Sequence, residues 1–438
     1  LLYARRAASW RGWLALAAVL AIVHPLRLVP IVTPPIPPAA MLGFGLPMAL
    51  AALLGLAVAE VVRRRTGETA GIFAFASATA LLDGIGYRHT ELGSWLATGS
   101  TQTEVLPLLQ ALSVAGLAGL GFLIAWAAAL AASLLGAEGA SRRWPHAVAL
   151  GLTLLSVLQA GAIRLDRAGG RSVSVGAVVT DLGPGAGGLP GPDALAANVE
   201  TLFERTRIAA GRGARLVVWN EVATLVEPAE EDALIARGQR EARVLGVDIV
   251  LAYGVFVRHE PFLMDDKYVF VTSEGAVLDS YSKHHPVPGE PSVKGVGPAR
   301  ILDRPYARVA GMICYDGDFP AMGRERAGAE IVVVPASDWR GIDPIHTLMA
   351  RQRAVENGYS LVRSTRWAAS AGFDAYGRVR GWMQTTEDND RVMVASVPVG
   401  RVATVYSALG DLPVAVAAAY LAVALGGSLR RRRAGSGG

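Results

Sequence analysis

Long apolar runs with almost no charge alternate with short polar joins over the first 166 residues. These runs lie at 12–26, 39–59, 69–87, 105–137 and 147–163, and one more follows at 412–429. About 20 apolar residues suffice to cross a bilayer, so the pattern predicts about five membrane spans before a long polar region and one span after it. The first run is short for a span, and the third contains Asp83, which is costly in lipid unless it faces protein.

Arginines gather at the ends of these runs. They precede the first run and follow the second, the fourth and the last: Arg5, Arg6 and Arg11; Arg63, Arg64 and Arg65; Arg142 and Arg143; and 430–433. Such clusters favour the cytoplasmic side of a membrane. If every cluster is cytoplasmic, the spans alternate without conflict and the polar region lies outside. We therefore predict a multi-pass protein of the cell (inner) membrane with an extracytoplasmic polar domain.

The pattern changes between residues 171 and 401, where short apolar segments alternate with amphipathic ones. It predicts strands at 172–180, 216–219, 247–257, 267–272, 276–281, 331–334, 360–364, 368–373 and 392–397, and helices at 193–210, 232–245 and 344–357. Strands that alternate with helices indicate an α/β domain. The predicted organisation is thus a helical membrane region at 1–166, a catalytic domain at 171–401 and a final membrane helix at 409–429.

Composition supports the membrane assignment. Of 438 residues, 52% are hydrophobic and only 18% are charged, which is too apolar for an ordinary soluble enzyme. The net charge of +5 comes with arginines in short runs beside apolar segments, so we read them as topology signals and expect no nucleic-acid partner. The chain begins with Leu1, and we expect that part of the natural N-terminus precedes it.

The single cysteine, Cys314, is the strongest candidate for chemistry. One cysteine excludes an internal disulfide framework and a cysteine zinc cluster. Cys314 follows an apolar segment that reads as a buried strand, and Asp318-Phe319-Pro320 after it can start a helix. A thiol at such a turn lies beside free backbone N–H groups, which lower its pKa and can stabilise an oxyanion. The alternative for Cys314 alone is a small buried core residue.

Two other predicted strands also end in candidate groups. Glu221 follows the strand at 216–219, and Lys283 follows the strand that ends at Tyr281. Strand ends of an α/β domain converge at one edge of a sheet, so we expect Glu221, Lys283 and Cys314 to meet. Glu221 can act as general base, Lys283 as a cation for the oxyanion together with the Tyr315 N–H, and Cys314 as nucleophile that forms a thioester.

These three residues, in this order, match the Glu-Lys-Cys triad of the nitrilase, or carbon–nitrogen hydrolase, superfamily. With its flanking spans the chain resembles the apolipoprotein N-acyltransferases, which are membrane-embedded members of that group. Further matching segments begin at Ser337, Ala350, Leu361, Asp374 and Gly410. The chain departs from the family pattern at Asn220, where Pro is usual, and at Asp316, where Glu is typical. The segment from Lys283 to Glu290 is also one residue shorter.

The resemblance implies a helical transmembrane bundle plus an α/β nitrilase-like domain built as an α-β-β-α sandwich. It implies Glu290, Tyr315 and Asp316 as accessory residues. For Trp339 and Trp367 an acyl pocket and an ordinary core position are both open. We expect no cofactor and no metal, because the adjacent His284 and His285 would point apart on a strand and no third ligand is evident.

The implied function is transfer of a fatty acyl group from a membrane phospholipid to the N-terminal amine of a lipoprotein through a cysteine thioester. One alternative is a membrane-tethered carbon–nitrogen hydrolase, an amidase that acts on an unknown amide. A second alternative is a non-enzymatic scaffold with a decayed site, which the intact triad argues against.

Overall fold

The computed structural model describes residues 1–6, 9–136, 143–167, 170–183, 188–388 and 390–435. The chain divides into two compact units. Unit 1 comprises Leu1–Asp166 together with Ala408–Gly438, and unit 2 comprises Arg167–Ser407. Unit 1 is helical, whereas unit 2 contains two β-sheets. Each unit is described separately below.

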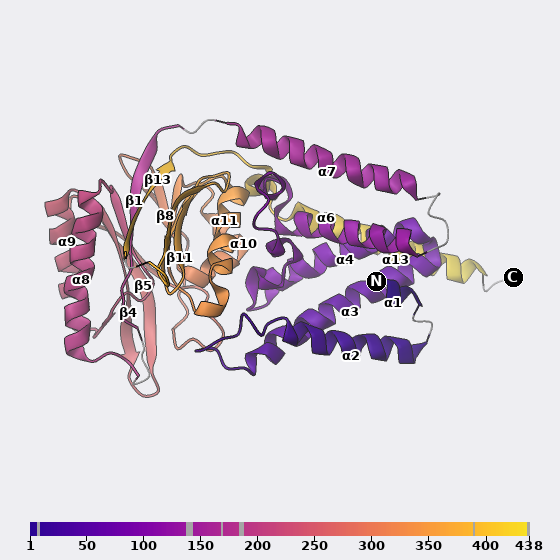
Figure 1. The fold of residues 1–438 in the computed structure, drawn as a ribbon, viewed down its shortest axis with the longest axis horizontal. Coiled ribbons are helices and arrows are strands. Elements are labelled where there is room, and N and C mark those ends of the chain that lie inside the picture. Colours follow the sequence, from indigo (N-terminus) through magenta and orange to yellow (C-terminus); the bar gives the residue numbers. More distant parts are fainter. Residues whose placement is uncertain (7–8, 137–142, 168–169, 184–187, 389, 436–438) are drawn as a thin grey trace. The chain divides into compact units, whose positions relative to one another are not determined.

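Unit 1 consists of helices that run alongside one another (Figure 1). Its α-helices are α1 (Leu2–Arg6), α2 (Trp10–Leu26), α3 (Ala40–Thr66), α4 (Glu68–His89), α5 (Leu106–Leu109), α6 (Leu112–Leu135), α7 (Trp144–Leu165) and α13 (Leu412–Gly435). Among the described residues, four of these helices, α3, α4, α6 and α7, are long and apolar enough to cross a membrane. Helix α2 and the segment Leu412–Gly426 of α13 are apolar but shorter.

The boundaries of these helices follow local chemistry. Gly67, with φ of 107°, separates α3 from α4 and supplies a backbone conformation that side chains disfavour. The predicted run at 105–137 is divided into the short helix α5 and the long helix α6. Asp83 lies in α4 and accepts hydrogen bonds from the backbone N–H and the hydroxyl of Thr98. Its carboxylate therefore faces protein, as the cost of a bare charge in lipid requires.

Several of the predicted cytoplasmic arginines come together at one end of unit 1. Arg5 and Arg63 both pair with Glu68 at the start of α4. Ser133 near the end of α6 donates to the same carboxylate, and Arg143 at the start of α7 donates to the Ser133 carbonyl. The structure thus gathers these basic groups at one end of the helices. Arg142 and the side chains of 430–433 lie outside the described residues.

Unit 2 contains two sheets. The first runs in the order β13-β1-β2-β4-β5-β6, with β3 beside β4, and the second in the order β12-β11-β10-β9-β8-β7. The strands are β1 (Ser172–Val178), β2 (Leu216–Trp219), β3 (Leu225–Val226), β4 (Asp248–Arg258), β5 (Leu263–Val271), β6 (Val277–Ser282), β7 (Ile301–Asp303), β8 (Arg308–Gly311), β9 (Ile331–Ser337), β10 (Ser360–Arg366), β11 (Ala369–Phe373), β12 (Val379–Gln384) and β13 (Val392–Pro398).

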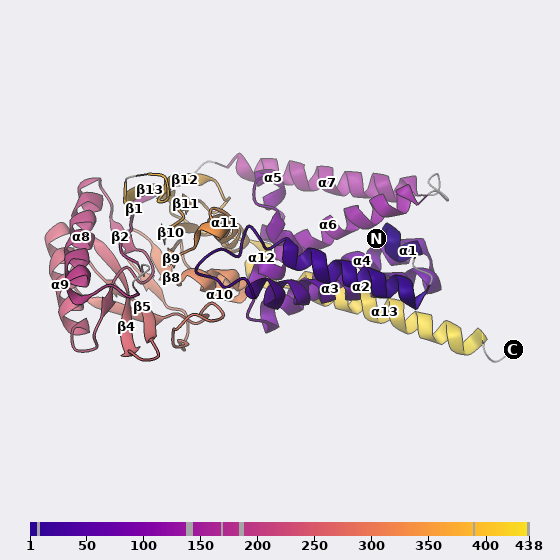
Figure 2. The ribbon, with the colours of Figure 1, turned by 60° about the horizontal axis from the view of Figure 1, so that its bottom comes forward.

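The sheets pack face to face between two layers of helices (Figures 1 and 2). Helices α8 (Pro192–Gly211) and α9 (Glu231–Leu245) cover the first sheet, and α10 (Pro320–Glu325) and α11 (Ile345–Asn357) cover the second. Strands β1, β2 and β4 are parallel, as are β8, β9 and β10. The loops that follow the carboxyl ends of these strands therefore lie at one common edge of each sheet. This α-β-β-α arrangement confirms the predicted fold class.

Some local predictions differ from the structure. Strands β3, β7 and β12 were not predicted, because they are short or carry little apolar alternation. The turn after Cys314 is also different from the prediction. Residues Cys314–Asp318 form a 3₁₀ helix first, and the predicted helix, α10, begins at Pro320 with Phe319 as its N-cap. Pro320 fits the first helical turn because its missing N–H has no partner there anyway.

Candidate active site

Cys314 opens the 3₁₀ helix η4 (Cys314–Asp318) that follows β8. Its backbone has φ of 42°, a region that residues other than glycine rarely enter. Its side chain is buried, with 4% of the residue exposed. Just before it, Gly311 permits close contact between the sheets, since a Cβ there would lie 2.6 Å from the Tyr268 hydroxyl of β5. The sequence thus places the sulfur where β8 ends, against the other sheet.

Lys283 follows β6 and lies among carboxylates. Its Nζ is 2.7 Å from Glu221 Oε1 and 2.7 Å from Glu290 Oε2, and its side chain is fully buried. Glu221 follows β2 and is 3% exposed. The Glu290 carboxylate also accepts from the Val287 N–H, which closes the segment after Lys283 into a turn. The structure therefore brings together Glu221, Lys283 and Glu290, three of the residues singled out in the sequence.

Burial would lower the pKa of Lys283, but the carboxylates of Glu221, Glu290 and Asp266 raise it well above its ordinary value. The ammonium group is therefore retained. Burial raises the pKa of the Cys314 thiol well above its usual range, Glu221 raises it further, and Lys283 opposes both effects. The sulfur thus lies within the electrostatic reach of both Glu221 and Lys283. A buried thiol of this kind needs a base to take its proton before it attacks.

Asp266 is a buried member of the same cluster that sequence reasoning missed. It comes from β5, is fully buried, and has a carboxylate oxygen 3.6 Å from Lys283 Nζ. Oxygens of Glu221, Asp266 and Glu290 all lie within 4.8 Å of one another. Burial and the neighbouring Glu221 raise the pKa of Asp266 well above its ordinary value. Both effects favour the protonated form of Asp266, which is the carboxyl group of the cluster farthest from Lys283 Nζ. The signal available was an acidic pair, Asp265-Asp266, inside a strand.

Asp316 connects two segments of the site through hydrogen bonds. One carboxylate oxygen accepts from the N–H groups of His284 and His285, and the other accepts from the Ile313 N–H and the Tyr281 hydroxyl. Asp316 therefore ties the segment after Lys283 to the turn that carries Cys314. Its oxygens are engaged in these four bonds, which favours a positioning role. The neighbouring predicted residue, Tyr315, is buried and packs edge-on against Phe319.

The two predicted substrate-binding tryptophans each follow a strand of the second sheet. Trp339 follows β9, whose Ser337 carbonyl is 3.8 Å from the Cys314 sulfur. Trp367 follows β10, has φ of 62°, and stacks under the Arg366 guanidinium at 4.2 Å from its ring centroid. Both rings are half-buried. A role for them in an acyl pocket stays a prediction.

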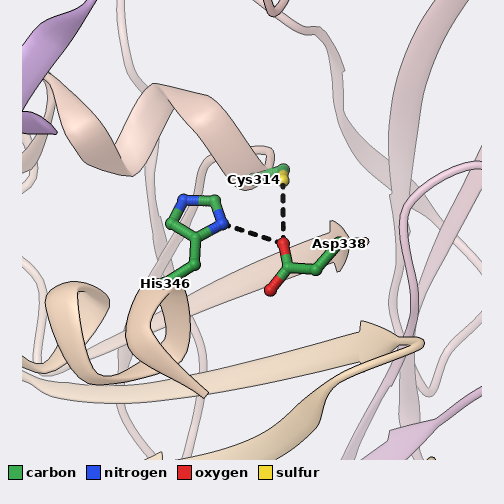
Figure 3. A group of neighbouring side chains, drawn as sticks. All are labelled: Cys314, Asp338 and His346. Atoms are coloured by element: carbon green, nitrogen blue, oxygen red, sulfur yellow. Dashed lines mark hydrogen bonds and ion pairs between the residues drawn. The ribbon is translucent and has the colours of Figure 1, made fainter. Parts of the chain in front are cut away.

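Cys314, Asp338 and His346 form a second cluster, with one ligand-type atom of each within 4.8 Å of the others (Figure 3). These residue types can hold a metal ion. However, a guanidinium nitrogen of Arg363 lies 2.9 Å from Asp338 Oδ1 and 2.8 Å from His346 Nδ1. The guanidinium occupies the Asp338 oxygen and the His346 nitrogen that a metal ion would need, so we interpret the cluster as an ion-pair network. His284 and His285 take no part in it, because they stack on Tyr281 and Phe319.

This geometry defines a class of enzyme. A buried thiol, a carboxylate base and a buried ammonium support attack on a carbonyl carbon, with a covalent thioester as intermediate. The carbon–nitrogen hydrolase family profile matches residues 186–406, about half of the chain. The chain belongs to the carbon–nitrogen hydrolase family, as its Glu-Lys-Cys pattern predicted.

Sequence similarity to curated relatives extends over both units. The chain is 29% identical over 415 residues to an apolipoprotein N-acyltransferase of Geobacter metallireducens, covering 87% of this chain and 79% of that protein. It is also 29% identical to the apolipoprotein N-acyltransferase of Bradyrhizobium diazoefficiens, over 90% of this chain and 79% of that protein. The predicted resemblance to these acyltransferases is thereby confirmed. Among solved structures, an amidase from Nesterenkonia sp. superposes on 53% of this chain and 92% of its own, with a TM-score of 0.43 and 22% identity.

Proposed function

We propose that this protein is a membrane-bound N-acyltransferase that moves a fatty acyl group from a phospholipid to the N-terminal amine of a lipoprotein. The observation that carries the proposal is the buried Lys283 ammonium, 2.7 Å from Glu221 and within electrostatic reach of the Cys314 sulfur. The names of the relatives support acyl transfer as the reaction, and the four long apolar helices support substrates that reside in a membrane.

In the first half-reaction Glu221 takes the thiol proton and the sulfur attacks the ester carbonyl of the phospholipid. Lys283 and the Tyr315 N–H stabilise the tetrahedral oxyanion. The C–O bond then breaks, Glu221 returns the proton to the leaving alcohol, and a lysophospholipid departs. The acyl group remains on Cys314 as a thioester.

In the second half-reaction the lipoprotein amine attacks the thioester carbonyl. Glu221 takes a proton from the amine, the C–S bond breaks, and the sulfur leaves as a thiolate that is reprotonated for the next cycle. Attack by water would instead release a free fatty acid. Glu290 holds Lys283 during both halves, and Trp339 and Trp367 line the acyl-chain pocket.

The proposal includes an arrangement in the cell. Residues 1–166 and 409–429 form the part that lies in the inner membrane, and 171–401 form the catalytic domain on the extracytoplasmic side. Gathered arginines at one end of unit 1 support this orientation. The acyl donor and the acceptor both reside in the bilayer. A site held at the bilayer surface is therefore reached by diffusion within the membrane instead of through the bulk solution.

The test is mass spectrometry of the purified protein after incubation with phospholipid vesicles. We expect a fatty-acyl adduct on Cys314 that neutral hydroxylamine removes, and none in Cys314→Ala. Glu221→Gln should slow its formation by about 10²–10⁴-fold, the usual contribution of a general base. Adding a peptide with a lipid-modified N-terminal cysteine should discharge the adduct onto the peptide, whereas the same peptide with an acetylated N-terminus should not. Absence of any adduct, together with turnover of simple amides, would establish the amidase alternative.

A further inference from the structure

A chain of four buried charged groups lies behind Cys314. His346 of α11 stands between two carboxylates, with Nε2 2.6 Å from Asp318 Oδ2 and Nδ1 2.8 Å from Asp338 Oδ1. Figure 3 shows the Asp338 carboxylate between the His346 ring and the Cys314 sulfur. Asp338 in turn is held by both terminal nitrogens of Arg363, at 2.8 and 2.9 Å. The chain of groups therefore runs from Asp318 through His346 and Asp338 to Arg363.

Arg363 reaches the sulfur itself. Its Nη2 lies 3.8 Å from Cys314 Sγ, within hydrogen-bond range for sulfur, and its side chain is fully buried. Its Nη1 also donates to Thr347 Oγ1 at 2.6 Å. The guanidinium is thus fixed by two oxygens of Asp338 and a hydroxyl, in the bidentate geometry that restrains arginine most strongly. Nη2 also lies 2.8 Å from His346 Nδ1, but a protonated Nδ1 cannot accept a hydrogen bond. The second hydrogen of Nη2 is therefore left for the sulfur.

We propose that Arg363 is a further catalytic residue, which donates a hydrogen bond to the Cys314 sulfur and stabilises its thiolate form, while Asp338 and His346 position it. The inference rests on the proposed function in one respect, namely that Cys314 is the nucleophile. A sulfur anion appears twice in that reaction, when the thiol loses its proton to Glu221 and when the C–S bond of the thioester breaks. A hydrogen bond from a cation is stronger to the anion than to the neutral thiol or the thioester, so it assists both steps.

The charges around the sulfur come from several elements. Glu221 after β2 and Asp338 after β9 raise the pKa of the thiol, beyond the rise that burial causes, whereas Lys283 after β6 and Arg363 of β10 lower it. His346 of α11 acts through Asp338. Its own pKa is raised to about 9, because Asp318 and Asp338 outweigh the effect of burial. At neutral pH the imidazolium therefore offsets part of the Asp338 charge that would otherwise oppose the thiolate.

A purely structural role for Arg363 makes a different prediction. In that case the Arg363–Asp338 pair would only join β10 to the end of β9, and its loss would lower stability without changing the ionisation of the thiol. Arg304 provides a matched control for this possibility. It makes the same kind of bidentate pair with Asp248, at 2.7 and 3.1 Å, and is not among the groups that act on the sulfur.

The experiment measures alkylation of Cys314, the chain's only cysteine, by iodoacetamide between pH 6 and pH 10.5 in detergent. For Arg363→Met we expect an alkylation rate at pH 7.5 about tenfold below that of the unaltered protein, because one pKa unit corresponds to a tenfold change in thiolate. The profile should shift to higher pH, and Arg363→Lys should restore part of the rate. Arg304→Met should keep the original profile.

Asp338→Asn gives an effect of opposite sign. The substitution removes a charge that opposes the thiolate, but it leaves an amide oxygen that can still accept from Arg363 and hold it in place, so alkylation at pH 7.5 should become faster. A general disturbance of the site would instead slow both variants. A folded Arg363→Met with the original pH profile overturns the inference. If Arg363→Met does not fold, Arg363→Gln replaces it in the same measurement, and an original pH profile there overturns the inference equally. Suppose that Cys314 of the unaltered protein is alkylated normally but the protein forms no acyl adduct. This result would contradict the proposed function and leave the inference on Arg363 standing.

Discussion

Three residues beside the site hold a backbone conformation that only glycine adopts easily. Val222 has φ of 45°, Cys314 of 42° and Trp367 of 62°. Each follows a strand of the two sheets, and Val222 comes directly after Glu221. Such conformations cost about 1–3 kcal/mol apiece and persist only where the surroundings enforce them. At the scale of single residues, these backbone conformations therefore lower the stability of the fold while they orient Glu221 and the Cys314 sulfur toward a common point.

Asp266 leads to a prediction about pH and stability. Its pKa is raised in the folded protein by burial and by Glu221, whereas an unfolded aspartate titrates near pH 4. Above that pH the unfolded chain releases the proton that the folded protein keeps, so Asp266 destabilises the fold increasingly as pH rises towards the folded pKa. Asp266→Asn, which is neutral at every pH, should therefore unfold at a higher temperature at pH 7, by at least ~2 °C.

Thermal unfolding in detergent at pH 5, 6, 7 and 8 measures this effect. The gap between Asp266→Asn and the unaltered protein should widen with pH over this series. Glu221→Gln serves as comparison, since it removes a carboxylate that binds Lys283 Nζ directly at 2.7 Å, and it should destabilise. An Asp266→Asn variant that is less stable at pH 8 than the unaltered protein would mean that Asp266 is ionised and pairs with Lys283.

At the scale of elements, the site depends on how loops from different strands are fastened together. Asp316 in η4 receives hydrogen bonds from the backbone on both sides of the site, including His284 and His285 after Lys283. Without this carboxylate, three buried or half-buried N–H groups would lose their acceptor. Each such loss costs about 1–3 kcal/mol. The segment carrying Lys283 and the turn carrying Cys314 would then be free to separate.

Asp316→Ala should accordingly lower the free energy of unfolding by about 3 kcal/mol or more and slow formation of the acyl adduct. Chemical unfolding monitored by tryptophan fluorescence measures the first effect, and adduct mass spectrometry measures the second. The exposed Asp303 in the edge strand β7 is the control, and Asp303→Ala should leave both properties near their original values. An active Asp316→Ala protein of unchanged stability would show that this fastening is dispensable.

The sequence was sufficient for most of the elements but not for every contact between them. Glu221, Lys283 and Cys314 could be selected because each follows an apolar strand, and the ends of such strands meet. Asp266 and Arg363 lie within strands β5 and β10, where a polar residue can face either side. Which side is internal depends on how the two sheets pack, and no local pattern encodes that. The edge strand β7 was missed for another reason, because its three residues are too few to show an apolar alternation.

At the scale of the whole molecule, the chain combines a helical unit with a unit of two stacked sheets, and the helical unit is built from segments at both ends of the sequence. The two segments meet where Tyr87 and Arg88 of α4 bind Asp411, just before α13. This contact ties the first and last parts of the chain together, so unit 2 is an insertion between two segments of one helical unit.

The proposed orientation predicts a pattern of thiol labelling. In a Cys314→Ser background, Ser9→Cys places a thiol beside the N-terminal arginines, and His89→Cys places one at the far end of α4, where both positions are exposed. Because arginine clusters remain cytoplasmic, a membrane-impermeant maleimide should label His89→Cys in spheroplasts and should label Ser9→Cys only after permeabilisation. The reverse pattern would invert the topology and place unit 2 in the cytoplasm.

Strand β13 has a consequence for how the protein is made. It lies antiparallel to β1 along its whole length, with Ser172 opposite Pro398, and forms the outer edge of the first sheet. While the ribosome is still adding the intervening residues, β1 has an open edge, and open edges are prone to pair with other chains. The sheet is completed only when residue 398 has emerged, shortly before α13. A nascent chain interrupted earlier would carry Cys314 on an unfinished scaffold, so truncated products should aggregate without acquiring enzymatic competence.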